Sequence, residues 1–215
     1  MTAPAIFPSL TRDEVFRLET PRLWLRWPTM ADAQSLRHWV GKPDVATMTS
    51  SFPVGISVNQ LHERIAEVRA ANADGCALGF VLTHQGDDDS AIGMVGVSLR
   101  ANGALALGYH LHPALWGQGL MTEAVKRLVN AAFALTPELD DIEASVRPDN
   151  IGSRRVLEKC GFASVGLGEL LSPHYGRVAV KRYVRLRSEP SPLALAAARH
   201  APTAPPLGFQ LCGLV

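Results

Sequence analysis

The sequence predicts an α+β fold, in which a mixed and mostly antiparallel sheet is covered by helices. Three apolar segments typical of strands, at residues 77–84, 91–100 and 104–112, are separated by the polar turns 85–90 and 101–103. Short polar turns of this kind join neighbouring antiparallel strands. After the third segment the pattern changes, because two stretches follow in which a strand runs into a helix. The predicted sheet therefore combines hairpins with strand-to-helix units.

The other elements follow from the spacing of apolar residues. A strand is expected near Leu18 to Trp27, and helices are expected from about Met30 to Val40 and from about Val58 to Ala71. The three central strands are followed by a helix that begins near Gly119, a strand over Ile142 to Arg147, a short helix from about Asn150, and strands near Phe162 to Leu171 and Val178 to Arg187. We assign residues 1–187 to one domain.

Beyond Ser188 the composition changes. Five prolines interrupt an alanine-rich run at residues 193–199, and the last residues, 207–215, are apolar. We treat 188–215 as a Pro/Ala-rich C-terminal appendage. It either packs on its own domain or on a neighbour, or it is poorly ordered.

The composition is typical of one soluble globular domain. A chain of 215 residues can bury a substantial core, and its net charge of +1 argues against a broad nucleic-acid surface. It has no run of about 18 apolar residues and no signal-like start, so we expect a cytoplasmic protein without a membrane partner. Cys76, Cys160 and Cys212 lack metal-ligand spacing, so free thiols and no metal site are expected.

The most informative stretch, residues 108–124, reads Gly-Tyr-His-Leu-His-Pro-Ala-Leu-Trp-Gly-Gln-Gly-Leu-Met-Thr-Glu-Ala, that is, a strand, a turn with glycines and an amphipathic helix. The first turn of a helix leaves amides without partners, and these favour an anion together with the helix dipole. Gly117 and Gly119 let the backbone approach a pyrophosphate closely and adopt turn conformations that other residues resist. A tight connection without any ligand is the alternative.

Two widespread phosphate loops fit this stretch poorly. A Walker loop needs Gly-Lys-Ser/Thr at the helix start, whereas Leu120 follows Gly119. A dinucleotide fingerprint needs a third glycine where this chain has Thr122. Its ribose-binding acid should also follow the next strand, whereas the aspartates at 140–141 precede the strand 142–147.

The second strand-to-helix stretch contains a short, sharply bounded helix. Asp149 or Asn150 can cap its start, and Gly161 suits the left-handed residue just past its end. Phe162 is then expected to pack back on Leu157, as in a Schellman motif.

Together, these stretches resemble the GCN5-related N-acetyltransferase (GNAT) superfamily, and most closely its RimJ/RimL-like branch, which acetylates the N-termini of ribosomal proteins. That branch typically reads Gly-Tyr-x-Leu-x-Pro-x-x-Trp-Gly-x-Gly-x-Ala-Thr-Glu-Ala and then Asn-x-x-Ser-x-x-Val-Leu-Glu-Lys-x-Gly-Phe. Residues 108–124 and 150–162 match it at nearly every fixed position, and residues 18–26 look like its opening strand. The resemblance covers roughly residues 16–187. It implies the acyl-CoA N-acyltransferase fold, with a splayed central strand pair and helices on both faces.

The resemblance also implies acetyl-CoA as the acyl donor. The pyrophosphate would lie on the main-chain amides of Gln118 to Thr122, and the pantetheine arm would lie between the two splayed strands. The residues implied in cofactor binding are His110, Leu111, Gly117, Gln118, Gly119, Leu120, Met121, Thr122, Asn150 and Ser153. Met121 departs from the Ala or Gly that is usual in the family, and the larger side chain narrows the pocket if it points inward.

The implied reaction is attack of an amine on a thioester with loss of a thiolate, which an oxyanion donor and an acid assist. The superfamily takes the oxyanion donor from a strand amide, which here points to His110 or Leu111. Many members carry a tyrosine as the acid where this chain has Leu157. Ser153 is the remaining hydroxyl, and its alternative role is a hydrogen bond within its helix.

The base is less defined, because Ala106 stands where relatives in this branch often have an acid. His110 and His112 should share one face of their strand, and a histidine titrates near neutrality. The alternative for each is a packing role at the sheet edge or along the CoA arm. Further candidates lie in the region that closes over the acceptor in this superfamily: Glu169, His174 and Tyr175.

The sequence is least informative about the acceptor. A protein N-terminus, a small amine and an antibiotic amine all remain open as acceptors, and a homodimer remains open as the assembly. The alternative to an enzyme is a non-catalytic acyl-CoA-binding regulatory module, which Ala106 and Leu157 favour. The segment between the first two helices either shapes an acceptor groove or packs in the core through Trp39, Lys42, Asp44, Met48 and Phe52.

Overall fold

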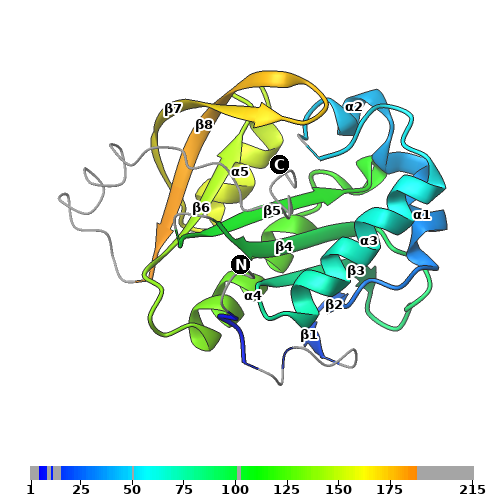
Figure 1. Cartoon of the computed structure of the whole chain (residues 1–215), viewed down its shortest axis with the longest axis horizontal. Helices are drawn as coiled ribbons and strands as arrows, with labels where there is room; N and C mark the ends of the chain where they lie inside the picture. Colours follow the sequence, from blue (N-terminus) through cyan, green and yellow to red (C-terminus); the bar gives the residue numbers. More distant parts are fainter. Residues whose placement is uncertain (1–4, 9–10, 12–15, 50, 101–102, 188–215) are drawn as a thin grey trace.

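The structure, a computed structural model, describes residues 5–8, 11, 16–49, 51–100 and 103–187. Within them a single sheet of eight strands has the order β1-β2-β3-β4-β5-β6-β8-β7 (Figure 1). Its strands are β1 (Arg17–Glu19), β2 (Leu23–Arg26), β3 (Ala77–His84), β4 (Gly93–Leu99), β5 (Leu105–Leu111), β6 (Asp141–Val146), β7 (Ala163–Ser172) and β8 (Gly176–Leu186). All neighbours are antiparallel except β5 and β6, which are parallel. The predicted fold class is confirmed.

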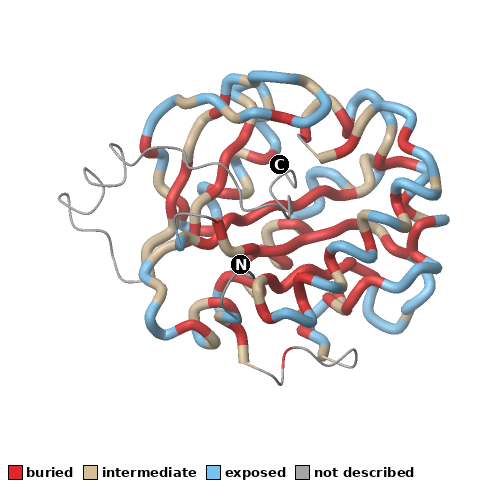
Figure 2. The backbone as a smooth tube through the Cα atoms, in the orientation of Figure 1, coloured by how far each residue is buried: buried red, intermediate tan, exposed pale blue. Residues whose placement is uncertain are grey.

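Helices cover both faces of this sheet. One face carries α1 (Asp32–Val40), α2 (Pro43–Ala46) and α3 (Val58–Ala73), and the other carries α4 (Leu120–Leu135) and α5 (Ile151–Lys159) (Figure 1). Along β3, Leu78 and Phe80 belong to the core with α4 and α5, whereas Val81 belongs to the core with α1 and α3. Buried backbone is accordingly concentrated in the central strands (Figure 2).

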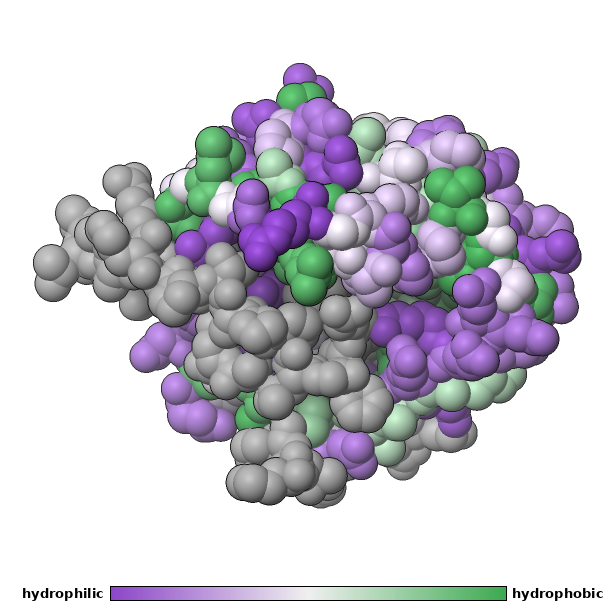
Figure 3. Space-filling view, turned by 45° about the horizontal axis from the view of Figure 1, so that its top comes forward, coloured by the Kyte–Doolittle hydropathy of each residue, from purple (hydrophilic) through white to green (hydrophobic). Residues whose placement is uncertain are grey.

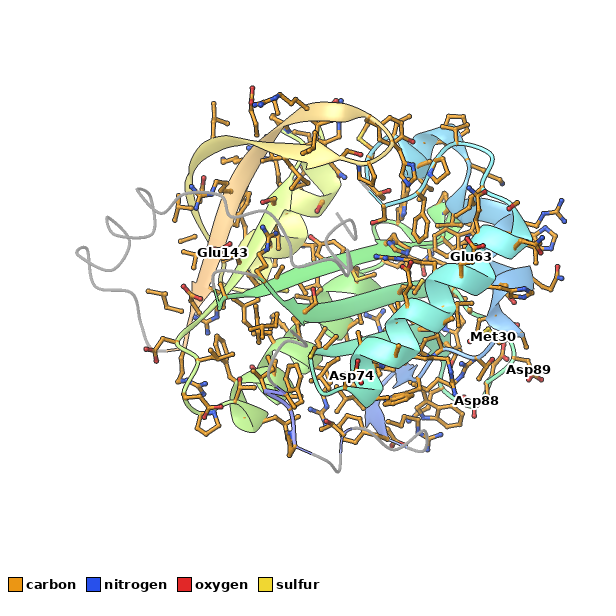
Figure 4. All side chains as sticks on the ribbon, viewed as in Figure 1. Met30, Glu63, Asp74, Asp88, Asp89 and Glu143 are labelled. Atoms are coloured by element: carbon orange, nitrogen blue, oxygen red, sulfur yellow. The ribbon has the colours of Figure 1, made fainter. Side chains whose placement is uncertain are left out.

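An ion pair fastens α1 to the sheet. Arg26 of β2 contacts the buried carboxylate of Asp32 at 2.7 Å. It also contacts Asp88 at 3.3 Å. Asp88, which Figure 4 labels, lies in the turn between β3 and β4. Asp32 in turn accepts a hydrogen bond from the Thr29 amide at 2.6 Å, at the start of the helix. These contacts fix the position of α1 relative to β2.

The prediction of a single strand over 18–27 is wrong. The chain forms two strands, because β1 ends at Glu19 and β2 begins at Leu23. Thr20 closes the turn between them: its hydroxyl accepts a hydrogen bond from the Leu23 amide at 2.9 Å and donates to the Leu23 carbonyl at 3.2 Å. Pro21 follows and has no amide to offer a ladder. The other strands lie within a few residues of the predicted bounds, and β3 has the predicted ones.

The central strands β5 and β6 pair only at one end. Their register joins Leu105 to Ile142 and Leu107 to Ala144, and no pairing follows beyond this. From Gly108 onward, β5 continues alone alongside β4, while β6 continues alongside β8 as far as Val146. This divergence is the splay that the resemblance implied.

The helix α5 begins and ends as predicted. The Asn150 side chain accepts a hydrogen bond from the Ser153 amide at 3.0 Å. At the other end, Gly161 has a φ of 81°, and the Phe162 amide donates to the Leu157 carbonyl at 3.0 Å. This is the six-to-one bond of a Schellman motif, and both apolar side chains are buried in the same core.

On the side of the molecule that Figure 3 shows, apolar side chains outside the grey atoms lie among hydrophilic ones rather than in one broad face. In the portion of the chain that the structure describes, no helix combines the length and hydrophobicity that a bilayer crossing requires. The predicted appendage, with Cys212, lies outside the described residues.

Candidate functional site

The turn before α4 holds two glycines in the left-handed conformation. The φ angle is 78° at Gly117 and 79° at Gly119, which is the N-cap of α4. A Cβ at Gly117 would meet nothing within 4 Å, so the backbone conformation, rather than crowding, favours glycine there. In this turn, Gln118 directs its carbonyl toward Arg22, whose Nη1 donates to it at 3.0 Å.

The amides of this turn are available to a ligand. Among the described residues, the amides from Gly117 to Thr122 donate to no other group, and the Glu123 amide, which donates to the Gly119 carbonyl at 3.1 Å, is the first to join the helix ladder. Unpaired amides at the positive end of a sixteen-residue helix form a favourable environment for an anion. We name residues 117–122 the phosphate loop.

The ladder between β4 and β5 shows which way each amide of β5 points. At one end the Arg100 amide donates to the Ala104 carbonyl at 2.8 Å, and at the other end the His112 amide donates to the Ile92 carbonyl at 2.8 Å. The even-numbered residues of β5 therefore bond to β4, and the odd-numbered ones face the opposite edge.

Tyr109 and Leu111 consequently present their main-chain groups to the splay. The carbonyl of Leu111 is occupied, because Trp116 Nε1 donates to it at 2.9 Å, but its amide has no partner among the described residues. His110 is opposite Met94 in the β4 register, so its amide belongs to that ladder. Of the two amides considered for the oxyanion, the one that faces the splay is that of Leu111.

A cavity of ≈ 610 Å³ opens where the splay meets the N-terminal ends of α4 and α5. This is a typical volume for a small-molecule site. The cavity brings the two strand-to-helix stretches together, and nine of the ten predicted cofactor contacts line it: His110, Leu111, Gly117, Gly119, Leu120, Met121, Thr122, Asn150 and Ser153. Gln118 is the exception, since its carbonyl is turned toward Arg22.

The hydroxyl of Ser153 points across the splay. Its Oγ lies 2.8 Å from the hydroxyl of Tyr109, so its partner is on β5 rather than one turn back in its own helix. Leu157, at the position where many family members have tyrosine, is buried in the core and does not line the cavity. The hydroxyls of Ser153 and Tyr109 therefore meet across the splay.

His110 lies on the other face of β5, in an apolar enclosure. Its ring is 4.9 Å from that of Phe52 and 6.0 Å from that of Trp39, and neither ring nitrogen has a hydrogen-bond partner among the described residues. Burial, together with the nearby Arg64 guanidinium, lowers the pKa of His110 to about 3. The imidazole is neutral near pH 7 and is a weak proton acceptor.

His112 shares that face, as predicted, since its ring lies 5.7 Å from Trp39. Its Nδ1 accepts a hydrogen bond from the Ala114 amide at 3.2 Å. It thereby caps the short 3-10 helix η2 (Pro113–Leu115), which leads from β5 into the phosphate loop. The described contacts give His112 a structural role.

The three candidates in the β7–β8 hairpin do not line the cavity. Glu169 is exposed and pairs with an arginine of the same hairpin at 3.1 Å. His174 Nε2 lies 3.2 Å from the Ser51 carbonyl, and the Tyr175 hydroxyl donates to the Phe52 carbonyl at 3.0 Å. The tip of the hairpin thus holds the segment that follows α2, next to His110.

Several lining residues were missed at the sequence level. Arg155 and Lys159 lie one turn apart on α5 and bring positive charge to the cavity lining. Their helical spacing is a signal that could have found them. The lining also includes Asp44, Val45, Met48 and Thr49, in and after α2; Asp44 and Met48 were predicted as possible groove residues, whereas Val45 and Thr49 were not. A helix of four residues gives too little periodicity to be recognised.

Residues 22–163 match the family model described as the acetyltransferase (GNAT) domain, which is well over half of the chain. This chain belongs to the GNAT acetyltransferase family. The phosphate loop, the splay and both strand-to-helix stretches of this GNAT enzyme lie within the matched residues or at their edge.

One curated relative of this GNAT enzyme is an uncharacterised N-acetyltransferase called p20, from Bacillus licheniformis. The two are 31% identical over 152 residues, which are 70% of this chain and 84% of the relative. Similar solved structures include the ribosomal-protein-S5-alanine acetyltransferase from Vibrio fischeri, at 19% identity with a TM-score of 0.68, covering 82% of this chain and 100% of that one.

RimJ of Mycobacterium smegmatis, solved in complex with CoA-disulfide, is also similar to the GNAT enzyme described here. It is 24% identical, with a TM-score of 0.68, and the match covers 87% of this chain and 96% of that one. At these identities both structures support the fold.

Proposed function

We propose that this acetyltransferase moves the acetyl group of acetyl-CoA to a primary amine, either a protein N-terminus or a small-molecule amine, by direct attack of the amine on the thioester. One observation carries the proposal: the unpaired amides from Gly117 to Thr122 open onto the same cavity as the free edge of β5. The amides can bind the pyrophosphate of the coenzyme, and the adjacent edge of β5 can bind its extended pantetheine arm.

The residues present fit coenzyme A at each point that can be compared. The phosphate loop offers main-chain donors and a helix dipole to the pyrophosphate. Arg155 and Lys159 add positive charge on the same cavity. The open edge of β5 at Tyr109 offers strand-like hydrogen bonds to the amide groups of the pantetheine arm. The predicted contact residues would hold the coenzyme, and Gln118 would contribute its main-chain amide.

The chain's own groups can assist the transfer at two points. The amide of Leu111 faces the splay and can donate to the oxygen on which negative charge develops. The hydroxyl of Ser153 can donate to the departing sulfur. His110, with its lowered pKa, holds a proton poorly, and Glu169 and Tyr175 lie away from the cavity lining. None of these candidate bases is placed to accept the proton of an ammonium acceptor, so we assign that first deprotonation, before the attack, to water.

This distribution of groups favours an acceptor that needs little help to lose its proton. An N-terminal amine has a pKa of about 8, whereas an alkyl amine has one of about 10. Near neutrality, a much larger fraction of an N-terminal amine is uncharged and ready to attack. Holding it close to the thioester in a closed cavity therefore supplies a larger share of the acceleration than for an alkyl amine. The name of the Vibrio fischeri structure, a ribosomal-protein-S5-alanine acetyltransferase, supports a protein N-terminus as the first acceptor to test.

The test is an acceptor screen with acetyl-CoA that measures thiol release. Peptides with free N-termini, polyamines and aminoglycosides are compared, beside a Gly119→Glu variant in which a carboxylate stands at the phosphate loop. Gly86→Glu is the matched control, because Gly86 also has a positive φ, of 88°, and open space around it, in a distant turn. We expect Gly119→Glu alone to abolish CoA binding and thiol release. Activity that survives Gly119→Glu would show that the phosphate loop is not the pyrophosphate site.

Binding of CoA without thiol release from any acceptor would instead favour a regulatory acyl-CoA-binding module. The weak basicity of His110 is the observation that supports this regulatory module. Calorimetric titration with CoA, run beside the screen, distinguishes the two functions.

A further inference from the structure

Two buried hydroxyl groups meet where β5 leaves β6. The Tyr109 hydroxyl lies 2.8 Å from Ser153 Oγ, and it donates to the Ser153 carbonyl oxygen at 3.0 Å. Both residues are buried, and both line the cavity. Because Tyr109 is on the open edge of β5 and Ser153 is in the first turn of α5, the pair bridges the two elements that flank the splay.

The hydroxyl of Tyr109 remains a hydrogen-bond donor at physiological pH. Burial raises its pKa above the ordinary value of a tyrosine, and the hydrogen bond with Ser153 offsets this only in part. Its proton has two acceptors on a single residue, the carbonyl oxygen and Oγ of Ser153. A rotation about the Tyr109 C–O bond suffices to move the proton from one acceptor to the other.

The two arrangements differ in where the Ser153 proton points. When Tyr109 donates to the carbonyl, the short contact between the hydroxyls requires Ser153 to donate to Tyr109. When Tyr109 donates to Oγ, the Ser153 proton no longer points at Tyr109. It can then point into the cavity. The second arrangement makes Ser153 a donor toward the splay, and the Tyr109 hydrogen bond polarises its O–H bond.

We propose that Tyr109 is a positioning residue, which donates to Ser153 Oγ and so directs the Ser153 proton at the sulfur of coenzyme A. The proposal rests on the function proposed above. In the transfer, the amine nitrogen bonds to the acetyl carbon, and the carbon–sulfur bond breaks with its electron pair on sulfur. Ser153 gives its proton to that sulfur and regains one from the amine nitrogen. Tyr109 keeps its own proton throughout, so no further reactant is needed.

A direct test uses bound CoA without any acceptor. The Ser153 hydroxyl should stabilise the thiolate of bound CoA, so the bound thiol should ionise at a lower pH in the wild type than in Tyr109→Phe. We follow thiolate formation by ultraviolet absorbance, and we subtract the same titration with desulfo-CoA to remove the protein's own thiols and tyrosines. The expected shift is about one pH unit, the size of one hydrogen bond to a charged group.

The control is Tyr183→Phe. Tyr183 of β8 is also buried and also bonds to α5, through its hydroxyl and the Glu158 carboxylate at 3.2 Å, but it does not line the cavity. We expect its bound thiol to titrate like that of the wild type, and we expect Ser153→Ala to titrate like Tyr109→Phe. Tyr109→Phe combined with Ser153→Ala should add nothing to Ser153→Ala alone, because Tyr109 acts through Ser153.

The same variants are then compared in turnover. Tyr109→Phe should lower kcat by about tenfold, while leaving KM for acetyl-CoA within about twofold of the wild type. An unchanged thiol titration in Tyr109→Phe, or an equal shift in Tyr183→Phe, would overturn the proposal. If the titration shifts as expected but no amine is acetylated, the proposed function fails while the action of the hydroxyl pair on the bound sulfur stands.

Discussion

Arg22 and Glu123 join the first turn of the sheet to the phosphate loop. The Arg22 side chain donates to the Glu123 carboxylate at 2.7 Å, and the Arg22 amide donates to the same group at 3.0 Å, across a separation of 101 residues. Although burial opposes it, hydrogen bonds from Thr20 and Arg22 lower the pKa of Glu123. Since Arg22 also binds the Gln118 carbonyl, it holds the loop in the conformation that leaves its amides free.

Arg22→Ala should therefore weaken coenzyme binding more than it weakens the fold. The Arg22 side chain is about half exposed, at 48%, so its ion pair contributes little to the free energy of unfolding. Without it the loop carbonyl and amides can reorient, and we expect the Kd for CoA to rise about tenfold, or about 1.4 kcal/mol. Calorimetry measures this. Arg17→Ala, which removes an exposed pair with Glu19, is the control and should bind CoA normally.

Gly117→Ala should also weaken CoA binding. The substitution meets no neighbouring atom, but a left-handed φ of 78° costs a residue with a Cβ roughly 1–2 kcal/mol. The loop can relieve this cost by changing conformation, which moves the amides away from the anion. We expect an increase in Kd of about tenfold. Gly86→Ala carries the same backbone cost in another turn, so an equal loss of affinity there would contradict the explanation.

The enclosure of His110 predicts that stability depends on pH. Its pKa is lowered to about 3 in the folded protein, so between about pH 6.5 and about pH 3 the unfolded chain binds a proton there that the folded protein does not. The free energy of unfolding should be fully retained above about pH 6.5 and fall below it, by at most about 1.4 kcal/mol per pH unit.

His110→Phe should remove this part of the acid sensitivity. Urea unfolding of the wild type and the variant at about pH 7 and about pH 5 measures the difference in slope. His38→Gln, at an exposed position of α1, should leave the slope unchanged. The same pH dependence in His110→Phe as in the wild type would mean that other groups cause it.

Arg187→Ala should destabilise the fold through the end of α4. The Arg187 guanidinium donates to the carbonyls of Phe133 at 2.6 Å and Leu139 at 3.0 Å, and to that of Thr136, the C-cap of the helix. These carbonyls have no partner within the helix, and hydrogen bonds to a charged group contribute about 1.5–3 kcal/mol each. We expect a loss of about 2–3 kcal/mol in urea unfolding, less than the sum over the bonds, because the site is only partly buried and water can replace the guanidinium. Arg177→Ala, whose pair with Glu169 is largely exposed, should lose less than about 1 kcal/mol.

Much of the local structure could be predicted because it depends on neighbours in the sequence. Asn150 caps α5, and Gly161 and Phe162 end it, through bonds that span only three to five residues. The same holds for the left-handed glycines of the phosphate loop. The motifs on either side of the splay were equally readable, since a strand that runs into a helix start has a pattern of its own.

The division of β1 from β2 was not predicted, because an apolar run with one proline does not show whether a threonine hydroxyl will close a turn. The direction of each β5 amide was also hidden, because it depends on the register with β4. Without that register, the sequence left His110 and Leu111 as equal candidates for the oxyanion donor.

The sequence by itself determined the glycine turn before α4, the caps of α5 and the family, because each depends on residue types at short, regular spacing. Only the tertiary structure decided that Tyr109 meets Ser153, 44 residues away, and that Arg22 meets the loop. It also decided that His110 is enclosed by Phe52, Trp39 and the charge of Arg64. Proton affinities and hydrogen-bond partners at a site depend on distances through space, which sheet register and helix packing set.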